Sequence, residues 1–133
     1  MTNPSVEPLW LRIRSLLAAF AVELRALDRP LAHTIARSSN DAFLLRGYLA
    51  FRKQAHGDEV AITVDVRSLD GQLILESDAC MDDGRVIAAG PSAQLPLPGG
   101  EVDKSPAVEN WLREFEQFLN DNALAVSKAV AQL

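Results

Sequence analysis

The sequence has few of the residues that form disulfides or bind structural metals in small proteins, or that act in catalysis. Its 133 residues include one cysteine and two histidines. A single cysteine cannot form an intrachain disulfide, and it cannot supply the thiolates of a structural metal site. We therefore expect a reducing compartment and a fold that depends on its hydrophobic core. A chain of this length buries roughly two thirds of its unfolded surface, which is enough for one such core.

Long uninterrupted apolar runs are also lacking. The apolar segment near the start of the sequence is broken by Arg12, Arg14, Glu23 and Arg25, and no basic segment precedes it. This pattern is neither that of a signal peptide nor that of a membrane span. We therefore expect a cytoplasmic protein with no membrane partner.

The net charge is −5, and it is unevenly distributed. Residues 1–53 carry eight Lys and Arg against four Asp and Glu, whereas residues 54–133 carry five against fourteen. The acidic part would repel a phosphate backbone, and the basic residues of the first part are scattered, which argues against a nucleic-acid partner. A basic protein partner suits the acidic part better. The alternative is that the two parts neutralise each other within the fold.

Two segments show the three- and four-residue spacing of an amphipathic helix. The first is residues 6–28, with apolar positions at Leu9, Ile13, Leu16, Leu17, Phe20, Leu24 and Leu27. Pro30 ends it, and a short helix is expected over 31–37. The second is residues 106–132, with apolar positions at Val108, Leu112, Phe115, Leu119, Val126 and Val130. Ser105 before Pro106 is a typical helix start, with the hydroxyl as N-cap.

Between these helices the apolar period changes to two, which predicts strands at 42–54, 59–69, 72–81 and 85–90. The intervening loops are short, so neighbouring strands must be antiparallel. Residues 91–104 are rich in Pro and Gly and are expected to form a surface loop, with an edge segment at 93–97. The predicted fold is a single α+β domain over residues 1–133, a four-stranded antiparallel meander covered on one face by an N-terminal and a C-terminal amphipathic helix.

The loop lengths predict which residues lie opposite each other. A two-residue turn at Asp70-Gly71 pairs Val66 with Leu75. A four-residue loop "AHGD" pairs Phe51 with Ile62, and Leu49 with Val64. Both hairpins place their apolar side chains on one face, and a slip of one residue in either would mix the two faces.

The stretch "ESDACMDDGRVIAAG" (76–90) gathers carboxylates, the single cysteine and a glycine. We interpret it as a strand and a three-residue turn, with Gly84 in the left-handed conformation. A calcium loop would need oxygen ligands at alternate positions over about a dozen residues. Cys80 has acidic surroundings and is interpreted as a structural thiol. His33, on the short helix, and His56, in a loop, are not expected to converge, so neither a metal nor another cofactor is predicted.

The opposite face of the predicted sheet gathers polar side chains, and seven of them are the candidate binding residues: Arg46, Tyr48, Arg52, Asp65, Arg67, Glu76 and Asp78. Tyr48, Asp65 and Glu76 are expected in one row across three strands. A pair of opposed carboxylates beside a tyrosine could serve acid–base chemistry or bind a cation. The alternative is a solvated face with cross-strand ion pairs.

No catalytic residue is assigned, because no nucleophile elbow, phosphate-binding loop or dinucleotide fingerprint is present. We favour a non-catalytic, acidic protein-binding module, chaperone-like or immunity-like, that uses the charged sheet face or an acidic patch. The alternative is a small-ligand-binding protein or enzyme that uses the Tyr48/Asp65/Glu76 face. A homodimer is also expected, because Trp10, Leu11, Trp111 and Phe118 fall beside the main helical stripes and could leave helix surface for a second copy.

Overall fold

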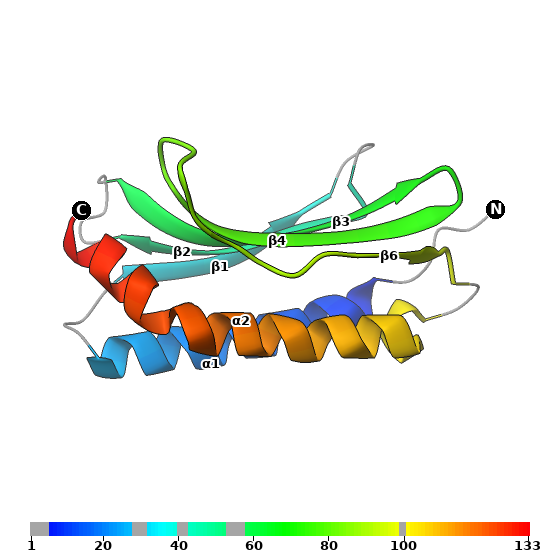
Figure 1. Cartoon of the computed structure of the whole chain (residues 1–133), viewed down its shortest axis with the longest axis horizontal. Coiled ribbons are helices and arrows are strands. Elements are labelled where there is room, and N and C mark those ends of the chain that lie inside the picture. Colours follow the sequence, from blue (N-terminus) through cyan, green and yellow to red (C-terminus); the bar gives the residue numbers. More distant parts are fainter. Residues whose placement is uncertain (1–5, 28–31, 40–42, 53–57, 99–100) are drawn as a thin grey trace.

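The structure is a computed structural model, and it describes residues 6–27, 32–39, 43–52, 58–98 and 101–133. Over these residues two α-helices pack on one face of a six-stranded antiparallel sheet (Figure 1). The elements are α1 (Glu7–Leu27), β1 (Ala32–Ser38), β2 (Leu45–Arg52), β3 (Glu59–Leu69), β4 (Gln72–Met81), β5 (Val86–Ala89), β6 (Ala93–Pro96), the 3₁₀ turn η1 (Val102–Lys104) and α2 (Pro106–Ala131). The predicted α+β architecture, with both helices on one face, is confirmed, but the predicted number of four strands is wrong, because β1 and β6 were not predicted as strands of the sheet.

Strand β1 corrects the sequence prediction of a short helix over 31–37. Its residues pair with β2 in antiparallel order, from Ala32 opposite Arg52 to Ser38 opposite Arg46. The helix prediction had no apolar stripe to support it, and the β-branched Thr34 and Ile35 favour an extended backbone. The edge of β2 supplies hydrogen-bond partners for that backbone, which an isolated helix of this length would lack.

The far side of β4 is shared by two short strands. β5 pairs with Asp78–Cys80, and β6 pairs with Gln72–Leu75. The edge segment expected at 93–97 is therefore present as β6, inside what was predicted to be a loop. Just before β6, the Pro91 carbonyl accepts hydrogen bonds from Trp111 Nε1 at 3.0 Å and from the Ser77 hydroxyl at 2.9 Å. These bonds tie the segment to both the sheet and α2.

The hairpin registers are right for one turn and wrong for the other. Asp70 and Gly71 have φ of 52° and 76°, as a type I′ turn requires, and Val66 lies opposite Leu75 as predicted. In the β2–β3 hairpin, however, Phe51 lies opposite Val60 and Leu49 opposite Ile62. Arg52, and not Gln54, lies opposite Glu59, so β2 is displaced by two positions. An even displacement leaves every side chain on its predicted face.

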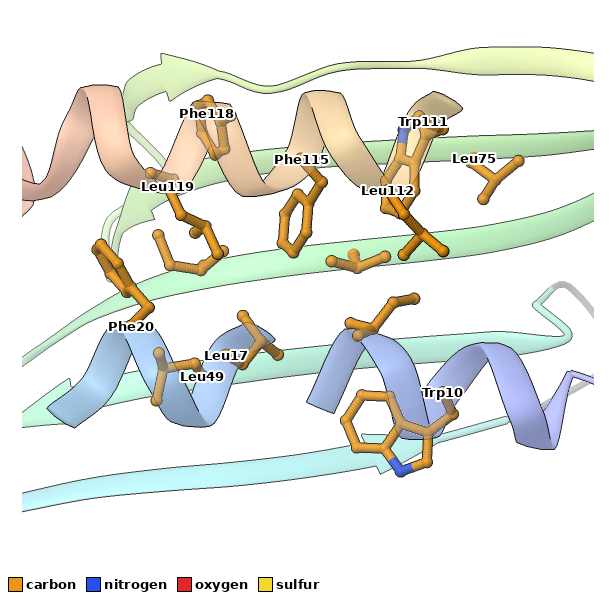
Figure 2. Packing of buried hydrophobic residues seen from close by; sticks show 14 of the residues in the cluster. Trp10, Leu17, Phe20, Leu49, Leu75, Trp111, Leu112, Phe115, Phe118 and Leu119 are labelled. Atoms are coloured by element: carbon orange, nitrogen blue, oxygen red, sulfur yellow. The ribbon is translucent and has the colours of Figure 1, made fainter. Parts of the chain in front are cut away.

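The core lies between the sheet and the helices, which run side by side in the same direction (Figures 1 and 2). The predicted apolar stripes face it, and only Leu16 among their described side chains is no more than partly buried; the side chain of Leu27 lies outside the described part. Trp111 stacks on Phe115 with ring centroids 5.2 Å apart. At the helix starts, Arg12 Nη2 donates to Glu109 Oε1 at 2.8 Å. The Ser105 side chain makes no capping hydrogen bond, so that part of the prediction is wrong.

Three of the four aromatic or apolar residues expected to leave free helix surface belong to the core. Trp10, Trp111 and Phe118 are 6%, 1% and 7% exposed, whereas Leu11 is 50% exposed. The buried stripes are wider than a sheet-facing stripe alone, because each helix packs against the other helix as well as the sheet. Trp10 fits where β2 carries Gly47: a Cβ on Gly47 would lie 2.5 Å from the indole Cζ3.

Candidate functional site

The face of the sheet that points away from the helices, here called the outer face, carries all seven candidate residues (Figure 1). β2 contributes Arg46, Tyr48 and Arg52, β3 contributes Asp65 and Arg67, and β4 contributes Glu76 and Asp78. Period-two alternation is the reason, since the residues that alternate with them, such as Leu49, Val66 and Leu75, are buried on the side of the helices. That these residues bind a partner remains a prediction.

The rows across the outer face differ from the predicted ones. Asp65 lies opposite Glu76, as predicted, but its neighbour on β2 is Arg46. Tyr48 lies opposite Thr63, which in turn lies opposite Asp78. The predicted Tyr48–Asp65–Glu76 row is wrong because of the two-residue displacement of β2.

Arginine side chains neutralise the opposed carboxylates of the outer face. Arg46 Nε lies 2.9 Å from Asp65 Oδ1, and Arg67 Nη2 lies 2.6 Å from Glu76 Oε1. The Arg46 guanidinium also lies over the ring of Phe43, 4.4 Å from its centroid. Exposed pairs of this kind contribute about 0–1 kcal/mol each to stability. Because each carboxylate already pairs with an arginine, it is less available to bind another cation.

A second polar group lies further along the same face. The Thr63 hydroxyl donates to Asp78 Oδ1 at 2.5 Å. Burial raises the pKa of the Cys80 thiol, and the negative charge of Asp78, a hydrogen bond to Asp78 and the charge of Glu59 raise it further. Cys80 therefore stays protonated at neutral pH, as the interpretation of a structural thiol requires.

Between these polar groups the outer face is hollowed. Ala50, Ala61 and Cys80 form a row of small side chains across β2, β3 and β4. The row beside it begins with Tyr48, which lies opposite Thr63. The resulting hollow has a volume of about 370 Å³, and its lining comprises Arg46, Gly47, Tyr48, Glu59, Ala61, Thr63, Cys80, Met81, Asp82 and Gly84. Asp65 and Glu76 are not part of it.

One wall of the hollow is the three-residue turn after β4. Gly84 has φ of 89° and donates its N–H to the Met81 carbonyl at 3.0 Å, while Met81 N–H donates to the Arg85 carbonyl at 2.8 Å. Asp83 Oδ1 accepts from the Arg85 backbone N–H at 3.0 Å, and this hydrogen bond is the largest cause of the lowered pKa of Asp83. The predicted turn is confirmed, but its part in a recess was not foreseen.

The recess ends in an acidic rim. Asp82 lines both the hollow and a smaller neighbouring cavity of about 140 Å³, to which Asp58 also contributes. Glu59 pairs with Arg52 at 2.7 Å and Asp83 pairs with Arg85 at 2.7 Å. Asp58 and Asp82 form no ion pair with another residue that the structure describes. The sequence signal for this rim was the acidic composition of residues 54–133.

The described residues contain no group of three or more His, Cys, Asp and Glu side chains that could hold a metal ion. His33 lies on β1, with its ring centroid 6.4 Å from that of Phe51, so its predicted place on a helix is wrong. His56 lies outside the described residues. Within the described parts of the chain, no helix is long and apolar enough to cross a membrane.

β6 is part of the sheet, and α2 lies on the face opposite to the outer face (Figure 1). Fold and site together define an α+β protein with an open antiparallel sheet face and a shallow, partly apolar recess on it. Comparisons with family models, with curated proteins and with solved structures each found no match.

Proposed function

We propose that this chain is a non-catalytic, acidic protein-binding module, chaperone-like or immunity-like, that takes up a segment of a partner protein on the outer face. The observation that carries the proposal is the hollow of about 370 Å³. Its floor and walls include Ala61, Met81 and the ring of Tyr48, and its rim is charged. An apolar centre within a polar rim is the usual anatomy of a protein–protein contact.

The open shape of the hollow favours a side chain over a metabolite. Small-molecule sites are clefts of roughly 300–1,000 Å³ that enclose most of the ligand. This recess is at the lower end of that range, but it opens onto a flat sheet face. An apolar side chain of a partner can enter it, while the rest of the partner lies along β2, β3 and β4.

Charge indicates which partner segment fits. Asp58 and Asp82 lie at the turn end of the recess without an ion pair to another described residue, and the chain carries a net charge of −5. A partner segment with Lys or Arg beside an apolar anchor side chain would place opposite charges together. Its rate of association would fall as the salt concentration rises, because the Debye length shortens.

A binding measurement tests the proposal. Fluorescently labelled peptides that combine an apolar residue with Lys or Arg are screened by fluorescence anisotropy. Binders are then measured against Ala61→Arg, which fills the hollow, and Ser68→Arg, which adds the same charge at an exposed position of β3 outside it. We expect Ala61→Arg to weaken binding by about tenfold or more and Ser68→Arg to leave it nearly unchanged.

Equal binding by the wild-type chain and Ala61→Arg would refute this use of the hollow. Circular dichroism of both variants confirms that they are folded. The alternative function, a small-ligand-binding protein or enzyme, retains Tyr48 in the hollow but loses Asp65 and Glu76 from it. A rise in melting temperature with a metabolite or metal, in the absence of any peptide binder, would favour that alternative by mass action.

A further inference from the structure

Strand β1 ends the sheet with few of the features that protect exposed strand edges. Among the described residues it pairs with β2 alone, so its other side leaves backbone N–H and C=O groups free. Natural edges are usually blocked by charged side chains, above all lysine, by proline or by a bulge. The charged side chain of β1 is Arg37, which pairs with Glu7 of α1 at 2.5 Å and so turns toward the helix. β1 has no lysine or proline, pairs regularly over its whole length, and presents small side chains on the outer face: Ala32, Thr34, Ala36 and Ser38. Such an edge is a template for another antiparallel strand.

The helix layer also stops short of this edge. A groove of about 440 Å³ lies between α1 and the inner face of β1. Ile35 lies in the middle of the strand, and Ala18 and Arg14 of α1 line the same groove, with Trp10 and His33 among its other lining residues. The sheet therefore extends past its helical cover on this side.

The flank of α1 that borders the groove is exposed and self-complementary. Glu7, Leu11, Arg14, Ala18, Val22 and Arg25 recur at helical spacing along this flank, and the half-exposed Glu7 pairs with Arg37 of β1 in the same chain. Leu11 and Val22 are 50% and 68% exposed. When the flank is laid antiparallel against a copy of itself with Ser15 opposite Ala18, Leu11 meets Val22, and Glu7 near one end comes close to Arg25 at the other.

We infer that β1 joins a second copy of this chain, antiparallel and about a two-fold axis near Ile35, so that two sheets become one and the α1 helices meet beneath it. The spacing agrees with this arrangement. α1 contacts both β1 and β2, so it lies beneath this pair of strands. Strands lie about 4.8 Å apart, so the two α1 axes would be two strand spacings, or about 10 Å, apart. Packed helices lie about 8–10 Å apart.

The partner is inferred to be a second copy of the chain because the β1 edge and the α1 flank can each pair with an identical surface. Ile35 opposite Ile35 places Thr34 opposite Ala36. The antiparallel helix register places Ala18 opposite Ser15 and Arg14 opposite Ala19, so the two Arg14 side chains are not directly opposed. The acidic start and basic end of the α1 flank are complementary only in the antiparallel direction that a two-fold axis produces. The surface is separate from the hollow of the outer face, so the inference goes beyond the proposed function.

Sedimentation velocity of the full chain, over a range of micromolar concentrations, tests the inference. We expect a species of twice the 14.5 kDa mass of one chain. Leu11→Lys and Val22→Glu each place a charge against an apolar side chain, and each should raise the dissociation constant by about tenfold or more. The double variant places Lys opposite Glu twice across the axis and should restore dimerisation. Leu124→Lys, at an exposed position of α2, is the matched control and should dissociate like the wild-type chain.

A disulfide provides an independent readout of the register. In a Cys80→Ser background, Ile35→Cys should form a covalent dimer under mild oxidation, whereas Ser68→Cys should not. A wild-type chain that stays monomeric throughout the range would overturn the inference. So would a dimer that tolerates both single changes, or single changes that the double variant fails to rescue. Since Leu11 and Val22 are exposed in the single chain, unchanged circular dichroism separates loss of association from loss of folding.

Discussion

The contact between Gly47 of β2 and Trp10 of α1 gives a quantitative test of how the helix layer is seated. An alanine Cβ at position 47 would lie 2.5 Å from Cζ3 and 3.2 Å from Cε3 of the indole. Carbon atoms pack comfortably at about 3.5–4.0 Å, so the ring would have to move by about 1 Å. Trp10 is only 6% exposed and cannot turn aside without displacing its neighbours.

Overpacking of this kind costs about 1–3 kcal/mol. For a chain of this length we take roughly 3–5 °C of melting temperature per kcal/mol, so Gly47→Ala should melt about 3–15 °C below the wild-type chain. Thermal unfolding followed by far-ultraviolet circular dichroism, which reports the loss of helix, measures this difference in melting temperature.

The double variant identifies the cause. Trp10→Leu removes the ring that an alanine at position 47 would strike, so the cost of Gly47→Ala should fall to nearly nothing in that background. Strong coupling between two residues in contact is the expected behaviour, and distant sites would instead add. Additive costs in this cycle would refute the explanation and place the role of Gly47 in its backbone alone.

Three further predictions concern the site and the core. Cys80 should react slowly with a thiol reagent at mildly alkaline pH, and Asp78→Asn should react faster in stopped-flow measurements because the charge that helps to raise the thiol pKa is removed; an unchanged rate would exclude a contribution from Asp78. A hydrogen bond from Arg12 is the largest cause of the lowered pKa of Glu109, so this pair stabilises the fold above the ordinary carboxyl pKa and stops doing so as the pH falls through the folded-state pKa; melting curves of Arg12→Met should therefore show a smaller loss of stability on acidification, and an equal loss would contradict the assignment. Trp111→Phe removes a hydrogen bond to the Pro91 carbonyl and part of a buried ring, and urea titration should show a loss of about 1–3 kcal/mol; a loss below about 0.5 kcal/mol would mean that the bond does not hold β6 to α2.

Elements with strong local signals were predictable from the sequence. The bounds of β3 and β4 agree with the prediction because Asp70-Gly71 is a two-residue turn with a defined register. Both long helices agree to within one residue because their apolar stripes are continuous. β1 was missed because a seven-residue segment carries little periodicity of its own, and it becomes a strand only where β2 offers an edge.

The face of the sheet that carries the candidate residues was predictable from the sequence, but the hollow on that face was not. Alternation along β2, β3 and β4 was enough to place the seven polar residues together. The lining of the hollow includes both Tyr48 and Thr63, and these residues lie opposite each other only in the observed register of β2. The prediction of a four-residue loop at "AHGD" does not give the observed pairing of Arg52 with Glu59.

The two helices that cover the sheet come from opposite ends of the described chain, and they lie next to each other (Figure 1). During synthesis the strands therefore leave the ribosome when only α1 is available to cover them. The apolar face of β3 to β6 stays uncovered until the 26 residues of α2 have been made. Until then the nascent chain exposes hydrophobic surface and unpaired strand edges, which recruit chaperones and promote aggregation. Rapid docking of α2 therefore protects the newly made protein from aggregation through its exposed sheet.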